Sequence, residues 1–457
     1  MASADPPADP PPEPSAPPKG KPSLLDRGLR IVGDVQAGEG ARAAVLGVTL
    51  FLLLFAYYLL KVARETLVLS HYDAEVKVYV AAGQALLLIP AVWAFGWLSS
   101  RVGRFRLVVV VTVFFAANLG LFALAYAASL NIALPFYVWV GVFNVFVIAQ
   151  LWAFANDVYT EAEGRRLFAV IGLGSSLGAI AGAYAAEPIG DAVGTGGIFV
   201  CALVILLSTL IGARWVHRHS HSHQEDDTPP PSKGAKNAFA LLISDRYYLL
   251  IAALLVLLNC ENTLGEYLLD RVLLEDIENT LGAAPDTDAV QEQVRAFKSL
   301  YYGAFNTLGF LIQLFITGRV MKKGGAGAAI LVLPVIALLG QTAVLLSGVA
   351  LMVLAVAKVS ENSVDYSLNS TARNALFLVV PREAKYSVKV LLDSVVVRMG
   401  DVIAGGVVLG GSALGLDSVS FVAVSAAITV IWLAVAFFLR REHNRRAEAL
   451  PEPKSAS

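Results

Sequence analysis

The stretch AAVLGVTLFLLLFAYYLLKVARETLVLS, residues 43–70, is apolar up to Leu60 and then carries Lys61, Arg64 and Glu65. A helix that crosses a membrane needs about 20 mostly apolar residues, so this stretch predicts a transmembrane helix. Positions three and four apart share a helix face, so Lys61 is expected to pair with Glu65, with Arg64 beside them. Two interpretations are open: the charges reach out to water beside the lipid, or they line a polar cavity.

Apolar runs of similar length recur along the rest of the chain. Of its 457 residues, 56% are hydrophobic and only 16% are charged, whereas soluble domains usually carry about 25% charged residues. About twelve runs are long enough to span a bilayer. They begin near Ala43, Val78, Leu107, Ile132, Leu167, Val193, Tyr247, Leu300, Ala326, Val349, Val390 and Val419. The sequence therefore predicts an all-α membrane protein with about 12 transmembrane helices.

The basic residues indicate how the protein is oriented. Lys and Arg precede run 1 and occur in the links after the even-numbered runs, whereas the links after runs 3, 5, 9 and 11 contain neither. Because basic loops stay in the cytoplasm, both termini are expected to be cytoplasmic, in a multi-pass protein of a bacterial inner (plasma) membrane. The net charge of −1 gives no basic face for a nucleic acid, so none is expected as a partner.

The chain divides into two halves of six runs each. We expect a Pro-rich disordered cytoplasmic tail at 1–36, an N-terminal half at 37–215, a cytoplasmic His- and Pro-rich linker at 216–240, a C-terminal half at 241–440 and a cytoplasmic tail at 441–457. The linker's alternating histidines would suit a transition metal, but a solvated loop is the simpler interpretation. RVGR at 101–104 matches RVMK at 319–322, and EGR at 163–165 matches EAK at 383–385, which indicates an internal duplication.

The link after run 2 resembles a known transporter motif. GWLSSRVGRFR, residues 96–106, is similar to the G-x-x-x-D-R-x-G-R-R loop of the major facilitator superfamily, with Ser100 in place of the acidic residue. This resemblance implies two six-helix pseudo-repeats. It also implies a substrate site between them near mid-membrane, and alternating access by rocking of the halves.

Several charges fall inside the apolar runs, where each costs about 2.5–3.5 kcal/mol when it faces lipid. Run 10 carries polar residues at steps of three or four, which places them on one helix face: Lys358, Glu361, Asn362, Asp365, Asn369 and Arg373. This face predicts a wet cavity, with Lys358 and Arg373 as substrate contacts and Glu361 and Asp365 in coupling. The alternative is a set of salt bridges that hold helices together.

Other runs carry fewer charges. Glu261 lies in the middle of run 7 and is expected in the cavity, whereas Asp270 is expected to be solvated near the membrane surface. Asp157 is expected in gating at the cytoplasmic end of run 4. The glycines at 174, 178 and 182 predict close helix packing. No Walker loop and no nucleophile with a base is found, so we expect no enzyme, no cofactor and no metal site.

Three stretches resemble signatures of the bacterial and plastid ATP:ADP antiporters. They are YYLLKVARETLVLS at 57–70, WAFANDVYTEAEGRRLFAVIGLGSSLGAIAGA at 152–183 and YSLNSTARNALFLVVPREAKYSVKVLLDSVVVRMGD at 366–401. The resemblance extends over essentially the whole membrane region. It implies exchange of nucleotides or related phosphorylated anions.

On this resemblance, Lys61, Arg64 and Glu65 take the places of an arginine, a lysine and an aspartate at the end of span 1, and Glu261 matches a span 7 glutamate. Arg64, Lys385, Lys389 and Arg398 would contact phosphates, for which guanidinium and ammonium groups are suited. Asp393, in the same matched stretch, and Glu65 are expected in coupling or gating. The chain departs from the family where Asp365 replaces a lysine.

Two other functions stay open. The first is a proton-coupled symporter of another solute, because acids and bases along the pathway are about balanced. The second is a membrane-embedded interaction module without transport. In each case we expect the lipid bilayer as surroundings and a monomer.

Overall fold

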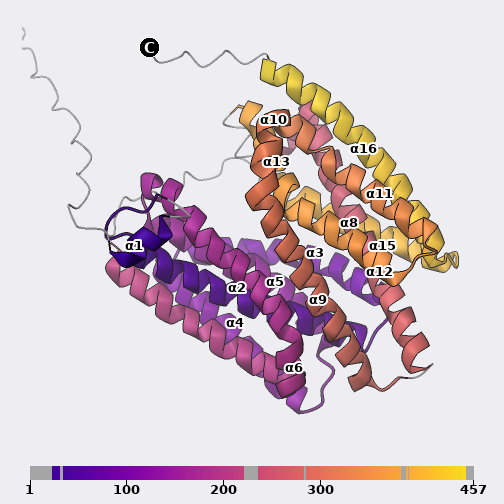
Figure 1. Cartoon of the computed structure of the whole chain (residues 1–457), viewed down its shortest axis with the longest axis horizontal. Coiled ribbons are helices and arrows are strands. Elements are labelled where there is room, and N and C mark those ends of the chain that lie inside the picture. The colour runs from indigo at the N-terminus through magenta and orange to yellow at the C-terminus, as the bar shows by residue number, and fades with distance from the viewer. Residues whose placement is uncertain are drawn as a thin grey trace, which may run out of the picture.

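The computed structural model describes residues 23–30, 34–220, 235–282, 285–381, 388–389 and 391–448, and within these ranges the regular structure is helical without a strand. The predicted all-α fold is therefore confirmed. Figure 1 shows the helices of the N-terminal half, indigo to magenta, beside those of the C-terminal half, orange to yellow. Both described termini lie at one end of the molecule, which we call the terminal end. The opposite end, where the chain turns at residues 70–73, is called the turn end.

The N-terminal half contains the first six helices. They are α1 (Leu24–Leu29), α2 (Gly40–Leu69), α3 (Ala74–Ser99), α4 (Arg104–Ala127), α5 (Ala133–Val158) and α6 (Glu161–His219). The long α6 is broken at Gly194, whose φ of 70° is a conformation that glycine adopts without strain. The helix therefore forms two spans rather than one.

The C-terminal half contains the remaining helices, several of them interrupted. They are α7 (Ala235–Ser244), α8 (Arg246–Leu281), α9 (Thr287–Ile312), η1 (Gln313–Thr317), α10 (Gly318–Ala329), α11 (Val332–Leu346), α12 (Leu351–Val364), η2 (Asp365–Asn369), α13 (Ser370–Leu376), η3 (Phe377–Val379), η4 (Leu392–Val396), α15 (Val397–Ala413) and α16 (Ser418–Glu448). The elements η1, η2 and η4 are single turns of π-helix. Such turns are frequent at functional sites.

The helix boundaries agree with the predicted spans. Eight helices in the described part of the chain are long and apolar enough to cross a membrane. The break at Gly194 divides α6 into two spans, and the break at Gly325 divides α10 between two spans. With the shorter segments α11, α12–α13 and η4–α15, the helices form the roughly twelve spans that the sequence predicts.

Four helices, α1, α6, α7 and α16, extend into segments that were expected to be tail or linker. Residues 24–29 form α1, which Ser23 caps and which Asp26 ties to α2 by accepting a hydrogen bond from the backbone N–H of Gly40 at 2.9 Å. The expectation of disorder is wrong for this helix, because the capping box of Ser23 and Asp26 satisfies its first backbone N–H groups and the tie fastens it to α2. Further on, α6 continues to His219 and α16 to Glu448. The linker residues between 220 and 235 lie outside the described residues.

The predicted glycine stripe packs α6 closely against α2. A Cβ atom at Gly174, Gly178 or Gly182 would lie 2.1–2.4 Å from the carbonyl oxygens of Gly47, Phe51 and Phe55. Only residues without a side chain allow this approach. The stripe therefore holds α2 in place, and α2 carries Lys61, Arg64 and Glu65.

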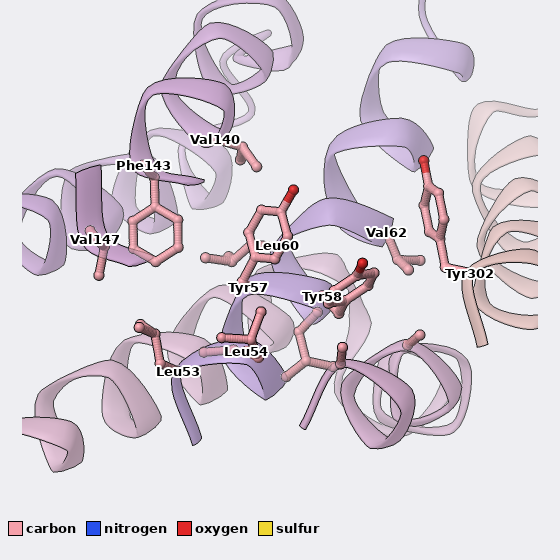
Figure 2. Packing of buried hydrophobic residues seen from close by; sticks show 14 of the residues in the cluster. Leu53, Leu54, Tyr57, Tyr58, Leu60, Val62, Val140, Phe143, Val147 and Tyr302 are labelled. Atoms are coloured by element: carbon pink, nitrogen blue, oxygen red, sulfur yellow. The ribbon is translucent and has the colours of Figure 1, made fainter. Parts of the chain in front are cut away.

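Aromatic side chains line the contact between the two halves. Figure 2 shows Tyr57 and Tyr58 on α2, Phe143 on α5 and Tyr302 on α9 in one buried cluster. The rings of Tyr58 and Tyr302 meet edge to face with centroids 6.2 Å apart. This contact joins the N-terminal half to α9 of the C-terminal half.

Candidate substrate cavity

A cavity of about 230 Å³ lies between the two halves. Among its described lining residues, four basic and four acidic side chains face it: Lys61, Arg64 and Lys77 with Glu65 from the N-terminal half, and Arg398 with Glu266, Asp270 and Asp401 from the C-terminal half. The charges that follow the first apolar run therefore line a central cavity.

Lys61 contacts aromatic rings rather than carboxylates. Its Nζ lies 4.2 Å from the ring centroid of Tyr302 and 5.3 Å from that of Tyr58. No described carboxylate lies within ion-pair distance of this ammonium group. The expected pair between Lys61 and Glu65 is therefore wrong, because Glu65 is taken by Arg64 and Lys77 instead. A cation over aromatic faces keeps its positive charge available to an anion.

A chain of buried ion pairs starts at Arg64 and crosses to the other half. Glu65 pairs with Arg64 and, at 2.5 Å, with Lys77 of α3. Lys77 also pairs with Asp270 of α8, and Asp270 pairs in turn with Lys298 of α9. Glu65, Asp270 and Lys298 are fully buried. We call these five residues the ion chain.

The burial of Asp270 corrects the expectation that it is solvated. α8 continues for eleven residues beyond it, to Leu281, and Leu273 and Ile277 in this extension pack against Val290 and Val294 of α9. The two lysines of the ion chain that hold Asp270 were not singled out from the sequence. Lys77 stands near the start of α3, where a lysine ordinarily faces water, and Lys298 lies in the middle of α9, before the apolar run that begins near Leu300, so no local pattern identifies them.

Glu266, rather than Glu261, is the glutamate of α8 that lines the central cavity. It accepts hydrogen bonds from the hydroxyl of Tyr301 at 2.5 Å and from the amide of Asn362 at 3.1 Å. Glu261 lies on another face of α8, in a small cavity inside the C-terminal half, with Lys358 and Glu361. These three residues do not line the central cavity, because Lys358 and Glu361 of α12 face the small cavity beside α8 and α11, whereas Asn362 of the same polar face lines the central one.

Four of the predicted residues lie nearer the terminal end. Arg373, Lys389 and Asp393 line a separate cavity of about 190 Å³. Asp365 pairs with Arg373 at 3.6 Å, and Lys389 donates a hydrogen bond to Asn374 at 2.8 Å.

Two more predicted residues have distinct surroundings. Asp157 pairs with the half-exposed Arg104 at 3.4 Å and lies away from the central cavity. Arg398 lines that cavity and pairs with Asp401 at 3.3 Å. Lys385 lies outside the described residues.

A second chamber adjoins the first near Lys61. Its volume is about 340 Å³, and the two chambers share Tyr57, Lys61, Asn144, Phe305 and Tyr366. The second chamber adds hydroxyl and amide groups from Ser175, Ser176, Asn306 and Gln313. The Ser175 hydroxyl is buried and has no partner in the described structure. The two chambers together thus offer cations, aromatic rings and unpaired hydrogen-bonding groups.

Polar contacts between the halves gather at the turn end. Besides Lys77 and Asp270, Ser412 donates a hydrogen bond to Glu75 at 2.6 Å, and Arg295 pairs with Asp191 at 2.7 Å. Each contact joins helices near the turn end. The structure is therefore closed at the turn end.

Two bundles of membrane-spanning helices around a polar, charged central cavity define a membrane transporter. Residues 46–382 match the Major Facilitator Superfamily, and the chain belongs to this superfamily.

The chain is also similar to curated carriers and solved transporters. It is 23% identical to ADP,ATP carrier protein 2 of Chlamydia pneumoniae, covering 93% of each chain, and 22% identical to ADP,ATP carrier protein 1 of Chlamydia muridarum (strain MoPn / Nigg), covering 65% of this chain and 62% of that one. The resemblance to ATP:ADP antiporters is thus confirmed as a similarity of sequence. A crystal structure of a POT family transporter in complex with 5-aminolevulinic acid shares the fold, with a TM-score of 0.64 and 13% identity over 88% of this chain and 96% of that one.

Proposed function

We propose that this protein exchanges nucleotides or related phosphorylated anions across a bacterial inner membrane by alternating access. The observation that carries the proposal is Lys61, a cation in the central cavity with no described carboxylate partner, surrounded by aromatic rings. The similarity to ADP,ATP carriers over nearly the whole chain supports the substrate class.

The phosphates are proposed to bind Lys61 and Arg64, with Arg398 on the opposite wall. A guanidinium beside an ammonium group suits phosphate oxygens, because both donate charge-assisted hydrogen bonds. The base and sugar are proposed to occupy the second chamber, where the rings of Phe305 and Tyr366 offer stacking surfaces. Ser175 and its polar neighbours would then select among bases.

Substrate binding is proposed to loosen the turn end through the ion chain. An anion that binds Arg64 competes with Glu65 for the guanidinium. Glu65 then has Lys77 as its one remaining ion-pair partner in the ion chain. The stronger attraction of Lys77 to Glu65 weakens the ion pair between Lys77 and Asp270. The contact between α3 and α8 weakens as a result, and the halves part only when an anion is bound. Such a device favours exchange over leakage.

We infer the orientation from the basic links in the sequence. With cytoplasmic termini, the closed turn end faces away from the cytoplasm, so the described state would be inward-facing. Arg373, Lys389 and Asp393 are proposed as an outlying contact for anions at the cytoplasmic end, with Lys385 nearby in sequence. Asp157, with Arg104, is proposed to act in gating at that same end.

Uptake into proteoliposomes tests this function. Radiolabelled ATP should enter vesicles that contain unlabelled ADP and should stay outside vesicles that contain none. Uptake at the same rate with and without internal nucleotide contradicts the proposal. A second candidate, proton-coupled symport of another solute, is favoured by the equal numbers of acidic and basic groups around the central cavity. It predicts uptake driven by a pH gradient into empty vesicles.

A further inference from the structure

The small cavity inside the C-terminal half holds more negative than positive charge. Lys358 donates a hydrogen bond to Glu361 at 2.7 Å and lies 3.9 Å from Glu261. All three side chains are buried, with 2–4% of each residue exposed. Two carboxylates therefore share a single ammonium group in the membrane interior.

The described helices around this cavity line it with no second cation. α11 presents Gln341, and α16 presents Ser425 and Thr429, all of them uncharged. The other charged groups facing the triad are acidic: Asp365 of η2, which has Arg373 as its own partner, and Glu266 of α8, which has Lys298 of α9 at 4.0 Å. Of the described residues that line the cavity, Lys358 is the one cation. A buried net negative charge is strongly unfavourable inside a membrane, so the cluster favours binding of one positive charge.

An unpaired amide oxygen gives a second, independent indication of a ligand. Gln341 is 7% exposed, and its amide nitrogen lies 2.9 Å from Thr429, 3.1 Å from Ser425 and 3.3 Å from Glu261. Its Oε1 is buried without a partner in the described structure. The cavity beside it measures about 20 Å³, room for one occupant the size of a water molecule. Carboxylate, amide and hydroxyl oxygens are the ligands that hard cations prefer.

Two glycines make room for this arrangement. A Cβ atom at Gly265 would lie 2.6 Å from the Lys358 Nζ, so any larger residue on α8 would displace the lysine. A Cβ atom at Gly340 would lie 3.0 Å from that of Ala357 and 3.4 Å from a carboxylate oxygen of Glu361. The close approach of α8, α11 and α12 is thus built into the sequence.

We propose that this cavity binds one monovalent cation, Na⁺ or a proton, between Glu261 and Glu361 beside Lys358. Glu261 shares α8 with Glu266, and Glu361 is next to Asn362 on α12, and both of these neighbours line the central cavity. A cation bound in the small cavity therefore changes the charge and the packing of α8 and α12, two helices that form the substrate site. This proposal does not depend on the substrate being a nucleotide.

The unfolding midpoint of the purified full-length protein, measured without nucleotide, tests the proposal. Sodium is varied at constant ionic strength with choline as the replacement, and pH is varied separately without sodium. A bound Na⁺ should raise the midpoint saturably, by about 2–4 °C. A bound proton should instead raise it as the pH falls, because the folded state then holds more protons than the unfolded state.

Variants assign either response to the cavity. Glu361→Gln leaves one carboxylate for one lysine, so it should abolish the response and raise the midpoint in the absence of ligand. Glu261→Gln should do the same and serves as the second variant should the first fail to fold. Gln341→Leu should abolish a sodium response and keep a proton response. Glu275→Gln, on the exposed face of α8, should behave as the wild type.

Two results would overturn the proposal. One is a wild-type midpoint that ignores both sodium and pH. The other is an unchanged response in both the Glu361 and the Glu261 variants. Because no nucleotide is present, neither result bears on the exchange assay, and failure of the two proposals can be told apart.

Discussion

At the residue scale, the charges after the first apolar run divide into two roles. Lys61 stands over aromatic rings without a described ion-pair partner, whereas Arg64 and Glu65 begin the ion chain that reaches α9. Buried ion pairs add little net stability, because desolvation offsets attraction, but loss of one partner is costly. The ion chain is therefore better suited to specify how the halves dock than to stabilise the fold.

A double-mutant cycle tests the contact between Lys77 and Asp270. Lys77→Met leaves two buried carboxylates short of a partner and should cost about 3–5 kcal/mol of unfolding free energy. Asp270→Asn should also destabilise, since it strands two lysines. The double variant should cost less than the sum of the single variants by about 0.5–3 kcal/mol. Denaturant unfolding in detergent measures all three.

The control cycle uses Arg271 and Glu275, an ion pair on α8 that is 28% and 50% exposed at the side chains. Its coupling should be at most about 1 kcal/mol. Equal coupling for the buried and the exposed pair would show that the ion chain is not a strong link.

Some residues of this site could be predicted from the sequence and others could not, for a physical reason. Lys61, Arg64, Glu65 and Arg398 could be predicted because a charge inside an apolar run is visible in the sequence. Lys77 and Lys298 could not, because their burial comes from packing between helices far apart in the chain. Glu261 and Glu266 sit on one helix, and only the three-dimensional packing separates their faces into two cavities.

At the element scale, the helices themselves could be predicted almost entirely. Each span follows from hydropathy, and the breaks at Gly194 and Gly325 fall where two apolar runs meet. The π-helical turns η1, η2 and η4 could not be predicted, since one extra residue in a turn leaves the hydropathy unchanged. η2 begins at Asp365, which it turns away from the central cavity toward Arg373.

The packing of α6 on α2 can be tested with glycine variants. Gly178→Val places branched carbon atoms where a Cβ alone would lie 2.2 Å from the carbonyl oxygen of Phe51. The helices must separate, so the unfolding midpoint and the yield of folded protein should fall sharply. Gly318→Val is the matched control, because nothing lies within 4 Å of its Cβ position. An equal loss in both variants would contradict close packing at the stripe.

At the scale of the whole molecule, the two halves contact each other at the turn end and must part there if access alternates. α3 and α15 provide a place to test this. A Cβ atom at Gly405 would lie 3.6 Å from that of Ala82, within the range of about 3.5–4.5 Å for disulfides. Ala82→Cys with Gly405→Cys should therefore cross-link the halves on oxidation.

The cross-link is expected to stop transport and its reduction to restore it. Cys201 and Cys260, both free thiols, are first replaced by serine. Transport by the oxidised double variant should fall to background and should return with a reducing agent, while Ala82→Cys alone stays active throughout. Full activity of the cross-linked protein would mean that the halves do not separate at α3 and α15.

The central claim is that Lys61 holds the anion that this protein exchanges. The most direct measurement is the initial rate of labelled ATP uptake into ADP-loaded proteoliposomes, for the wild type and for Lys61→Gln. Loss of one charge-assisted contact of about 1.5–3 kcal/mol predicts a rate at low substrate reduced about 10- to 100-fold. Lys323→Gln, at an exposed position, should keep the wild-type rate. Robust exchange by the wild type with an unchanged rate in Lys61→Gln would contradict the claim.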